Sequence, residues 1–304
     1  MVFGEEDQIF CVSSTNNGNT FTKPVLVGKV TGMHLGMTRG PQIASSSHFS
    51  LVTAIDKSGN IHSFRLSHQT KRWEPIELTN DLKGSAPEGL MSIAADDHDN
   101  FYAVWLDNRE KKHNQIFFSS LKSGSSWSKN RLIYESPSGH VCECCKPSIA
   151  TAGAQVTVMF RNWLWGSRDL YYLTSKNEGR TFSNASKLGE GTWKLNACPM
   201  DGGGLWIDGG QQIHSAWQRQ GEVYYSKPGQ KEKRIESGRN VSIVQEAKKP
   251  IILFQSEGKV AMATPSQGKV TIGDGGFAKG VVSPDNKILL VWEHDGSIVF
   301  KRIG

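Results

Sequence analysis

The stretch Tyr102-Ala-Val-Trp-Leu-Asp107 is a short apolar run that ends in bulky side chains followed by a polar residue. Short apolar runs without helical periodicity are typical of buried strands. Repetition of this unit predicts several copies of one β module, each with the apolar run as its most buried strand. The other copies end at Ile55-Asp56, Phe160-Arg161, Trp217-Gln218, Phe254-Gln255 and Trp292-Glu293.

Each buried run lies between two shorter candidate strands. The preceding candidates are 42–44, 92–95, 148–150, 205–207, 241–244 and 280–282, and the following ones are 61–66, 115–119, 169–174, 222–226, 259–263 and 297–303. Repeats of three or four strands, each about 40 to 55 residues long, are typical of β-propellers. The sequence therefore predicts an all-β chain with one domain over 1–304, a six-bladed β-propeller.

The N-terminal segment is expected to close the ring of blades. The last repeat ends at its third strand, so we expect an N-terminal strand at 24–27 to supply the missing outer strand. Residues 8–13 also resemble a third strand, which gives one strand more than six blades need.

Two segments share the pattern Ser-x-Asn-x-Gly-x-Thr-Phe, which suits a tight turn closed by side-chain hydrogen bonds and an aromatic plug. This pattern resembles the Asp-box, or BNR repeat, of the sialidase superfamily, with Asn in place of the usual Asp. The resemblance covers the whole chain and implies a sialidase-like propeller in which these residues are structural. They are Ser14, Asn16, Gly18 and Phe21, and Ser175, Asn177, Gly179 and Phe182.

Composition narrows the range of partners. The net charge is +6 with no block of like charge, which favours an anionic or small-molecule ligand over nucleic acid. No apolar run approaches the roughly 20 residues that span a bilayer. The first residues, 1–7, do not form a signal peptide.

Propeller topology predicts one shared site. Residues before the first strand of a blade and after its second strand meet at one mouth around the axis, where ligands commonly bind. We expect four of these residues to contact a substrate: Arg109, Trp163, Asp201 and Glu293.

Four of the five cysteines belong to this mouth. Cys142, Cys144 and Cys145 form Cys-Glu-Cys-Cys, and Cys198 opens a second segment. Sulfur-rich ligand sets favour copper, and the run lacks the paired spacing of a zinc knuckle. We expect a soft-metal or redox site. It would be formed by all four thiolates, or by three of them joined by His34, His140, Met37 or Met200.

Disulfides are the alternative to that site. They would join Cys142 or Cys145 to Cys198, or Cys144 to Cys145.

A second hypothesis is hydrolysis of a glycoside, or binding of a carboxylate sugar. Arg39-Gly-Pro resembles the segment with which sialidases hold the substrate carboxylate, and Asp56 falls where those enzymes keep their general acid. Arg161 would complete the site, since arginine pairs with carboxylates in a bidentate manner. The chain departs from that family because no tyrosine follows Tyr225 to serve as the nucleophile.

The motifs Gly-Met-His-Leu-Gly-Met-x-Arg-Gly-Pro, Cys-x-Cys-Cys-x-Pro and Cys-Pro-Met-Asp-Gly-Gly resemble a bacterial group of sialidase-like BNR proteins. That resemblance implies an exported protein, periplasmic or extracellular, and supplies no activity. The third hypothesis is therefore a non-catalytic scaffold that binds another protein.

Overall fold

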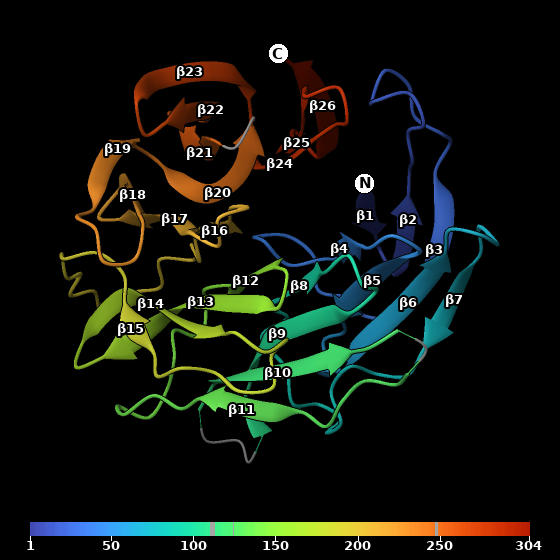
Figure 1. Cartoon of the computed structure of the whole chain (residues 1–304), viewed down its shortest axis with the longest axis horizontal. Coiled ribbons are helices and arrows are strands. Elements are labelled where there is room, and N and C mark those ends of the chain that lie inside the picture. Colours follow the sequence, from blue (N-terminus) through green and yellow to red (C-terminus); the bar gives the residue numbers. More distant parts are fainter. Residues whose placement is uncertain (110–112, 124, 247–248) are drawn as a thin grey trace. The chain divides into compact units, whose positions relative to one another are not determined.

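The computed structural model describes residues 1–109, 113–123, 125–246 and 249–304. These residues form 26 β-strands in seven antiparallel sheets (Figure 1). No helix among them is long and apolar enough to cross a membrane. By contacts the chain divides into two compact units, which are described separately below.

The first unit comprises Met1–Ser13, Lys23–Ser186 and Leu195–Met200. Its strands form one sheet of three strands and three sheets of four strands, each ordered as an antiparallel meander. They are β1 (Val2–Glu5), β2 (Gln8–Cys11) and β3 (Val25–Lys29); β4 (Gln42–Ser45), β5 (Phe49–Ile55), β6 (Ile61–Ser67) and β7 (Trp73–Ile76); β8 (Met91–Ala95), β9 (Phe101–Asp107), β10 (Gln115–Leu121) and β11 (Arg131–Tyr134); β12 (Ser148–Ala152), β13 (Gln155–Leu164), β14 (Ser167–Ser175) and β15 (Ser186–Lys187).

The second unit comprises Ser14–Thr22, Lys187–Lys194 and Asp201–Gly304. It holds two four-stranded sheets and one three-stranded sheet. Their strands are β16 (Gly204–Ile207), β17 (Ile213–Arg219), β18 (Glu222–Ser226) and β19 (Lys233–Ser237); β20 (Arg239–Glu246), β21 (Lys249–Ser256), β22 (Lys259–Thr264) and β23 (Gln267–Asp274); β24 (Gly276–Val282), β25 (Ile288–His294) and β26 (Ser297–Ile303).

The number of blades differs from the sequence prediction. The seven described sheets make this a seven-bladed β-propeller, and the expected six was wrong. The extra strand at 8–13 is β2, which pairs with β1 on one side and β3 on the other. The strand expected at 24–27 therefore belongs to this N-terminal sheet, where Val25 faces Cys11, and it does not complete the last blade.

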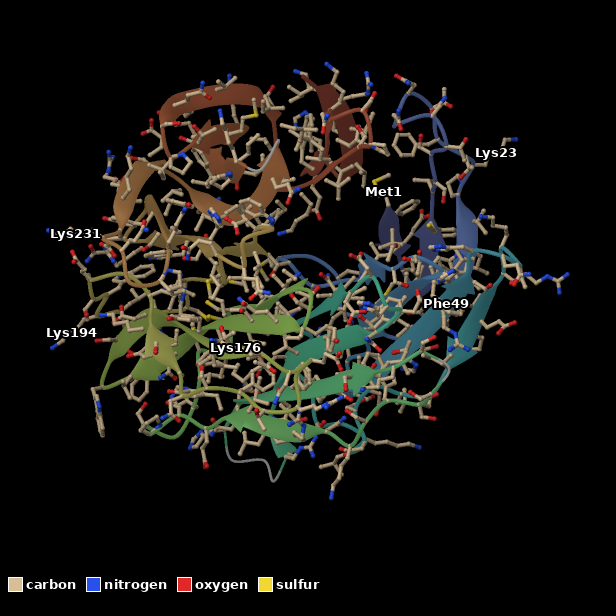
Figure 2. All side chains as sticks on the ribbon, viewed as in Figure 1. Met1, Lys23, Phe49, Lys176, Lys194 and Lys231 are labelled. Atoms are coloured by element: carbon tan, nitrogen blue, oxygen red, sulfur yellow. A yellow bond between two sulfur atoms is a disulfide. The ribbon has the colours of Figure 1, made fainter. Side chains whose placement is uncertain are left out.

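Strand β9 shows why the repeated apolar runs become the centres of blades. Every residue of β9 is buried, and Trp105 is fully so. Burial of each large apolar side chain stabilises the fold by about 1.5–3 kcal/mol. Asp107, the polar residue at the end of β9, is also structural, because it accepts a hydrogen bond of 2.8 Å from the Trp105 indole. Charged side chains such as Lys23 and Lys194 are instead exposed at the edge of the view (Figure 2).

The Asn-containing turns have nearly identical hydrogen bonds in both copies. In the second copy, Gly179 N donates to Ser175 Oγ at 2.9 Å, and Thr181 N donates to Asn177 Oδ1 at 2.9 Å. In the first copy the matching distances, to Ser14 and Asn16, are 2.8 and 2.9 Å.

The aromatic residue of each copy then packs edge-on against another ring of its own unit, Phe182 on Phe118 and Phe21 on Phe300. Each turn therefore fixes its strand end through both backbone and ring contacts.

The turn glycine gives a stability prediction. Gly179 has φ +75°, and a Cβ added there would lie 2.5 Å from the Phe118 ring. We expect Gly179→Ala to lower the free energy of unfolding by about 1–3 kcal/mol through overpacking, beyond the cost of its φ angle. Gly153→Ala is the matched control. Gly153 also has a positive φ, +55°, but a Cβ added there would have no other atom within 4 Å. Equal losses for the two variants in urea unfolding would contradict the packing role.

Candidate functional site

The Cys-Glu-Cys-Cys run is held at the end of the β13–β14 hairpin. Val141 bridges to Asn162, and Cys142 N donates to Arg161 O at 2.9 Å. A turn in which Cys145 N approaches Cys142 O at 3.4 Å then folds the run back. Cys142 and Cys145 are consequently buried, while Cys144 is half-buried.

One disulfide is present. It joins Cys144 to Cys198, whose Cα atoms are 6.1 Å apart, and both residues belong to the first unit. The pairings expected from the sequence, Cys142 or Cys145 with Cys198 and Cys144 with Cys145, were therefore wrong. The turn buries Cys142 and Cys145 and leaves Cys144 as the sulfur that reaches Cys198. Unlike the thiols beneath it, Cys198 is exposed.

The remaining sulfurs touch this disulfide. Cys142 Sγ lies 3.4 Å from Cys145 Sγ and 3.7 Å from Cys144 Sγ, and the third separation, Cys144 to Cys145, is 4.0 Å. Among the described residues, these three form the single His, Cys, Asp or Glu group whose ligand atoms all lie within 4.8 Å. Neither Cys198 nor His34 belongs to that group.

Arg168 supplies positive charge to the cluster. Its Nη1 lies 2.9 Å from Cys142 Sγ, and its side chain is buried between the cluster and the carbonyl of Leu195. A hydrogen bond with Cys145, together with the charges of Arg168 and Arg161, outweighs burial and lowers the pKa of Cys142 to about 6. The lowered pKa favours the thiolate of Cys142, which is the nucleophilic and metal-binding form of cysteine.

This pKa gives a pH prediction. The ordinary thiol value is 9.0, so the folded protein holds the thiolate more strongly than the unfolded chain. The resulting stabilisation is complete above pH 9.0 and is lost as pH falls through about 6. We expect thiolate absorbance near 240 nm to titrate with a midpoint of about 6, and Arg168→Met to raise that midpoint. An unchanged midpoint in folded Arg168→Met would show that Arg168 does not stabilise the thiolate.

A polar cavity lies beside the cluster. Its volume is about 310 Å³, and Glu143 links it to the cysteine run. Two buried oxygens, Asn114 Oδ1 and Glu143 Oε2, have no hydrogen-bond partner among the described residues. His140 Nδ1 donates to Val141 O at 2.9 Å, because a carbonyl oxygen can only accept. The residues that line the cavity are Glu88, Asn108, His113, Asn114, His140 and Glu143.

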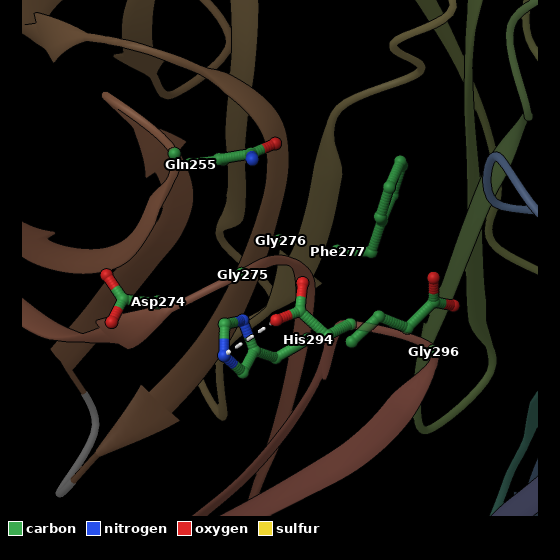
Figure 3. Close-up of a pocket in the computed structure, with 10 residues that line it drawn as sticks. Gln255, Asp274, Gly275, Gly276, Phe277, His294 and Gly296 are labelled. Atoms are coloured by element: carbon green, nitrogen blue, oxygen red, sulfur yellow. Dashed lines mark ion pairs between the residues drawn. The ribbon is translucent and has the colours of Figure 1, made fainter.

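The second unit has a cavity of its own, with a volume of about 390 Å³ (Figure 3). Its lining includes Glu293, which was predicted to contact a substrate, and two further carboxylates, Asp274 and Asp295. His294 Nε2 lies 3.6 Å from Asp295 Oδ2.

The residues proposed for hydrolysis all have protein partners. Arg39 Nε donates to Glu88 O at 2.7 Å, and Arg161, which is 1% exposed, donates from Nη1 to Arg168 O at 2.7 Å. Asp56 accepts from Asn60 N and lies 2.8 Å from His62 Nε2. Burial acts to raise the pKa of Asp56, but these hydrogen bonds prevail and the pKa is lowered.

Other predicted residues also have structural contacts. Arg109 pairs with Asp107 at 3.0 Å and covers the Phe117 ring. Trp163 stacks on His140, with ring centroids 4.7 Å apart.

In the second unit, Asp201 Oδ2 accepts from Asn240 N at 2.7 Å.

Two of the non-cysteine metal ligands predicted from the sequence, His34 and Met37, lie in the loop before β4. His34 packs beside Gly89, and its Nε2 has no hydrogen-bond partner among the described residues. Met37 is 52% exposed in a left-handed conformation, with φ 49°.

Sequence reasoning missed Arg168, Asn114 and Glu143. It also did not use the spacing of Cys142 and Cys145. These residues form a Cys-x-x-Cys pair, which is the sequence signal of a reactive thiol pair.

Comparison with known proteins fixes the fold. No protein-family model matches the chain, and no curated protein matches it. The chain does match solved structures. A fucose-specific lectin from Aleuria aurantia aligns with TM-score 0.58 and 13% identity, over 89% of this chain and 93% of that chain.

Two glycosidase structures align as well. The alpha-L-arabinanase of Penicillium chrysogenum gives TM-score 0.53 at 12% identity, over 88% of this chain and 86% of that chain. The GH93 alpha-L-arabinofuranosidase of Fusarium graminearum gives 0.51 at 13%, over the same shares. At these identities the likeness shows a shared β-propeller fold.

Proposed function

We propose that the protein is a soft-metal-binding propeller in which Cys142, Cys144 and Cys145 hold one copper(I) ion once the Cys144–Cys198 disulfide is reduced. The observation that supports this is the mutual contact of the three sulfurs, at 3.4, 3.7 and 4.0 Å. Three sulfurs placed around one ion in a plane, each at a bond length of about 2.3 Å, would be about 4 Å apart.

The donor set favours copper(I) over zinc. Zinc takes four ligands in its structural sites, whereas the group within 4.8 Å offers three sulfurs without Cys198 or a carboxylate. Soft thiolate ligands select copper(I). Three thiolates and one monovalent cation carry net negative charge, and Arg168 at 2.9 Å from Cys142 offsets part of it.

Copper binding gives a third prediction. Reduced protein, titrated with copper(I) against a chromophoric chelator under anaerobic conditions, is expected to bind one ion per chain. Cys142→Ser, Cys144→Ser and Cys145→Ser should each weaken this binding, because each removes one of the three sulfurs of the group. Cys198→Ser and Cys11→Ser should retain it, since Cys11 is buried in β2 away from the run. Equal affinity in Cys142→Ser would refute the site.

The disulfide also supports the proposed export. Disulfides persist in oxidising compartments such as the periplasm and the extracellular space, and are rare in the cytosol.

A second candidate function is glycan binding in the cavity beside the cluster. The supporting observation is a pair of acceptors without a hydrogen-bond partner among the described residues, Asn114 Oδ1 and Glu143 Oε2. Glu143 Oε2 also lies 3.4 Å from His140 Nδ1 and 3.7 Å from Arg168 Nη1, at ion-pair distances. Sugar hydroxyls are donors that satisfy such acceptors, and an unsatisfied buried acceptor costs about 1–3 kcal/mol. Arg39 connects to this cavity by holding the backbone of Glu88. If the bound glycan is also hydrolysed, the proposed catalytic residues are Arg39, Asp56 and Arg161.

Glycan binding gives a fourth prediction. L-fucose and arabinobiose, sugars of the kind bound in the lectin and arabinanase structures, serve as probes in calorimetric titration. Glu143→Gln should weaken binding by about tenfold or more, because hydrogen bonds to a charged group contribute about 1.5–3 kcal/mol. Asp274→Asn, in the cavity of the second unit, is the control and should leave the affinity unchanged. Absence of binding by the wild type would eliminate this candidate.

A further inference from the structure

We infer that the cysteine cluster performs thiol–disulfide exchange, with Cys142 attacking the Cys144–Cys198 disulfide and Cys198 leaving at the surface. The inference concerns the same cysteines as the proposed copper site, but it describes their oxidised state and requires no metal. It assigns a separate role to each of the four sulfurs.

Contact and access define these roles. Cys142 Sγ lies 3.7 Å from Cys144 Sγ, at van der Waals contact with the sulfur that it would attack. Arg168 Nη1, at 2.9 Å, supports the anionic form of the attacking thiol. Cys142 and Cys145 are 0% and 1% exposed, so a solvent-borne disulfide cannot reach them. Cys198 and its neighbour Ala197 are exposed.

The first step balances within the protein. The Cys142 thiolate forms a bond to Cys144 Sγ, the Cys144–Cys198 bond breaks, and its electron pair leaves on Cys198 Sγ. One disulfide and one thiolate become another disulfide and another thiolate. No outside oxidant is consumed, because exchange conserves the number of disulfides.

A second step involves Cys145. Its Sγ lies 3.4 Å from Cys142 Sγ, so its thiolate can attack Cys142 and release Cys144 as the leaving thiolate. The proton lost by Cys145 passes to the departing thiolate of Cys144, so Cys198 remains a thiolate. The sum of both steps converts the inner dithiol, Cys142 and Cys145, into a disulfide and the outer pair, Cys144 and Cys198, into a dithiol.

The substrate class follows from which sulfur reaches solvent. After exchange, the Cys198 thiolate can attack a disulfide brought from solution, forming a mixed disulfide and releasing one substrate thiol. Cys144, the former partner of Cys198, then displaces the second substrate thiol and restores the Cys144–Cys198 bond. The substrate is therefore an accessible organic or protein disulfide, which is reduced by the two electrons of the inner dithiol.

Trapping of Cys198 tests the exchange. Folded, oxidised protein is incubated with a maleimide without reductant, and its disulfides are mapped by peptide mass spectrometry. We expect labelled Cys198 together with a new Cys142–Cys144 or Cys142–Cys145 bond. Cys145→Ser should stop at the Cys142–Cys144 bond, Cys142→Ser should lose the labelling, and Cys11→Ser should behave as wild type.

Two results would overturn the inference. One is wild-type protein in which Cys144–Cys198 stays intact and Cys198 unlabelled throughout. The other is folded Cys142→Ser labelled at Cys198 as fast as wild type. The wild-type map decides the matter even if a variant does not fold.

Cys198→Ser separates this inference from the copper site. That variant cannot hold the disulfide but keeps the three-sulfur group. Copper(I) binding by Cys198→Ser with no exchange in wild type would leave the proposed function standing and the inference false. Exchange in wild type without copper(I) binding in either protein would leave the inference standing and the proposed copper site false.

Discussion

The register of the β13–β14 ladder is the constraint on which the cysteine site depends. Pairing runs from Val156 opposite Ser175 to Leu164 opposite Ser167. It presents the Arg161 carbonyl to Cys142 N and brings the Arg168 guanidinium to Cys142 Sγ. A slip of one residue would turn every side chain of one strand to the opposite face of the sheet. The chemistry of the cluster therefore depends on the backbone pairing of the two strands beside it.

The central strands of the blades could be predicted from the sequence, but the number of blades could not. Runs such as 101–106 are apolar because both faces of the strand are covered, so they stand out in the sequence. The N-terminal sheet has no such run. Its first strand, Val2–Glu5, is short and half-buried, and nothing in its composition separates it from a loop. The seventh blade was therefore visible in the sequence only as a surplus strand at 8–13.

For the site, the sequence predicted that the two cysteine segments meet but not which cysteines pair. The Cys144–Cys198 disulfide joins these segments. Which sulfur bonds to which depends on side-chain directions within a single turn. That turn buries Cys142 and Cys145 and leaves Cys144 toward Cys198. The role of Arg168 could not be predicted for a related reason. A charged residue inside a strand can be assigned a role only when its contact in the folded chain, here Cys142, is known.

The Asn residues of the two Ser-x-Asn-x-Gly turns have a consequence for behaviour in acid. A carboxylate at this position would gain a proton as pH falls and weaken as an acceptor, whereas the amide oxygens of Asn16 and Asn177 do not titrate. Other turns of the chain do depend on carboxylates: Asp96 and Asp208 each accept two backbone N–H groups, and the pKa of each is lowered. Acidification therefore loosens the β8–β9 and β16–β17 turns while these two amide-closed turns keep their hydrogen bonds.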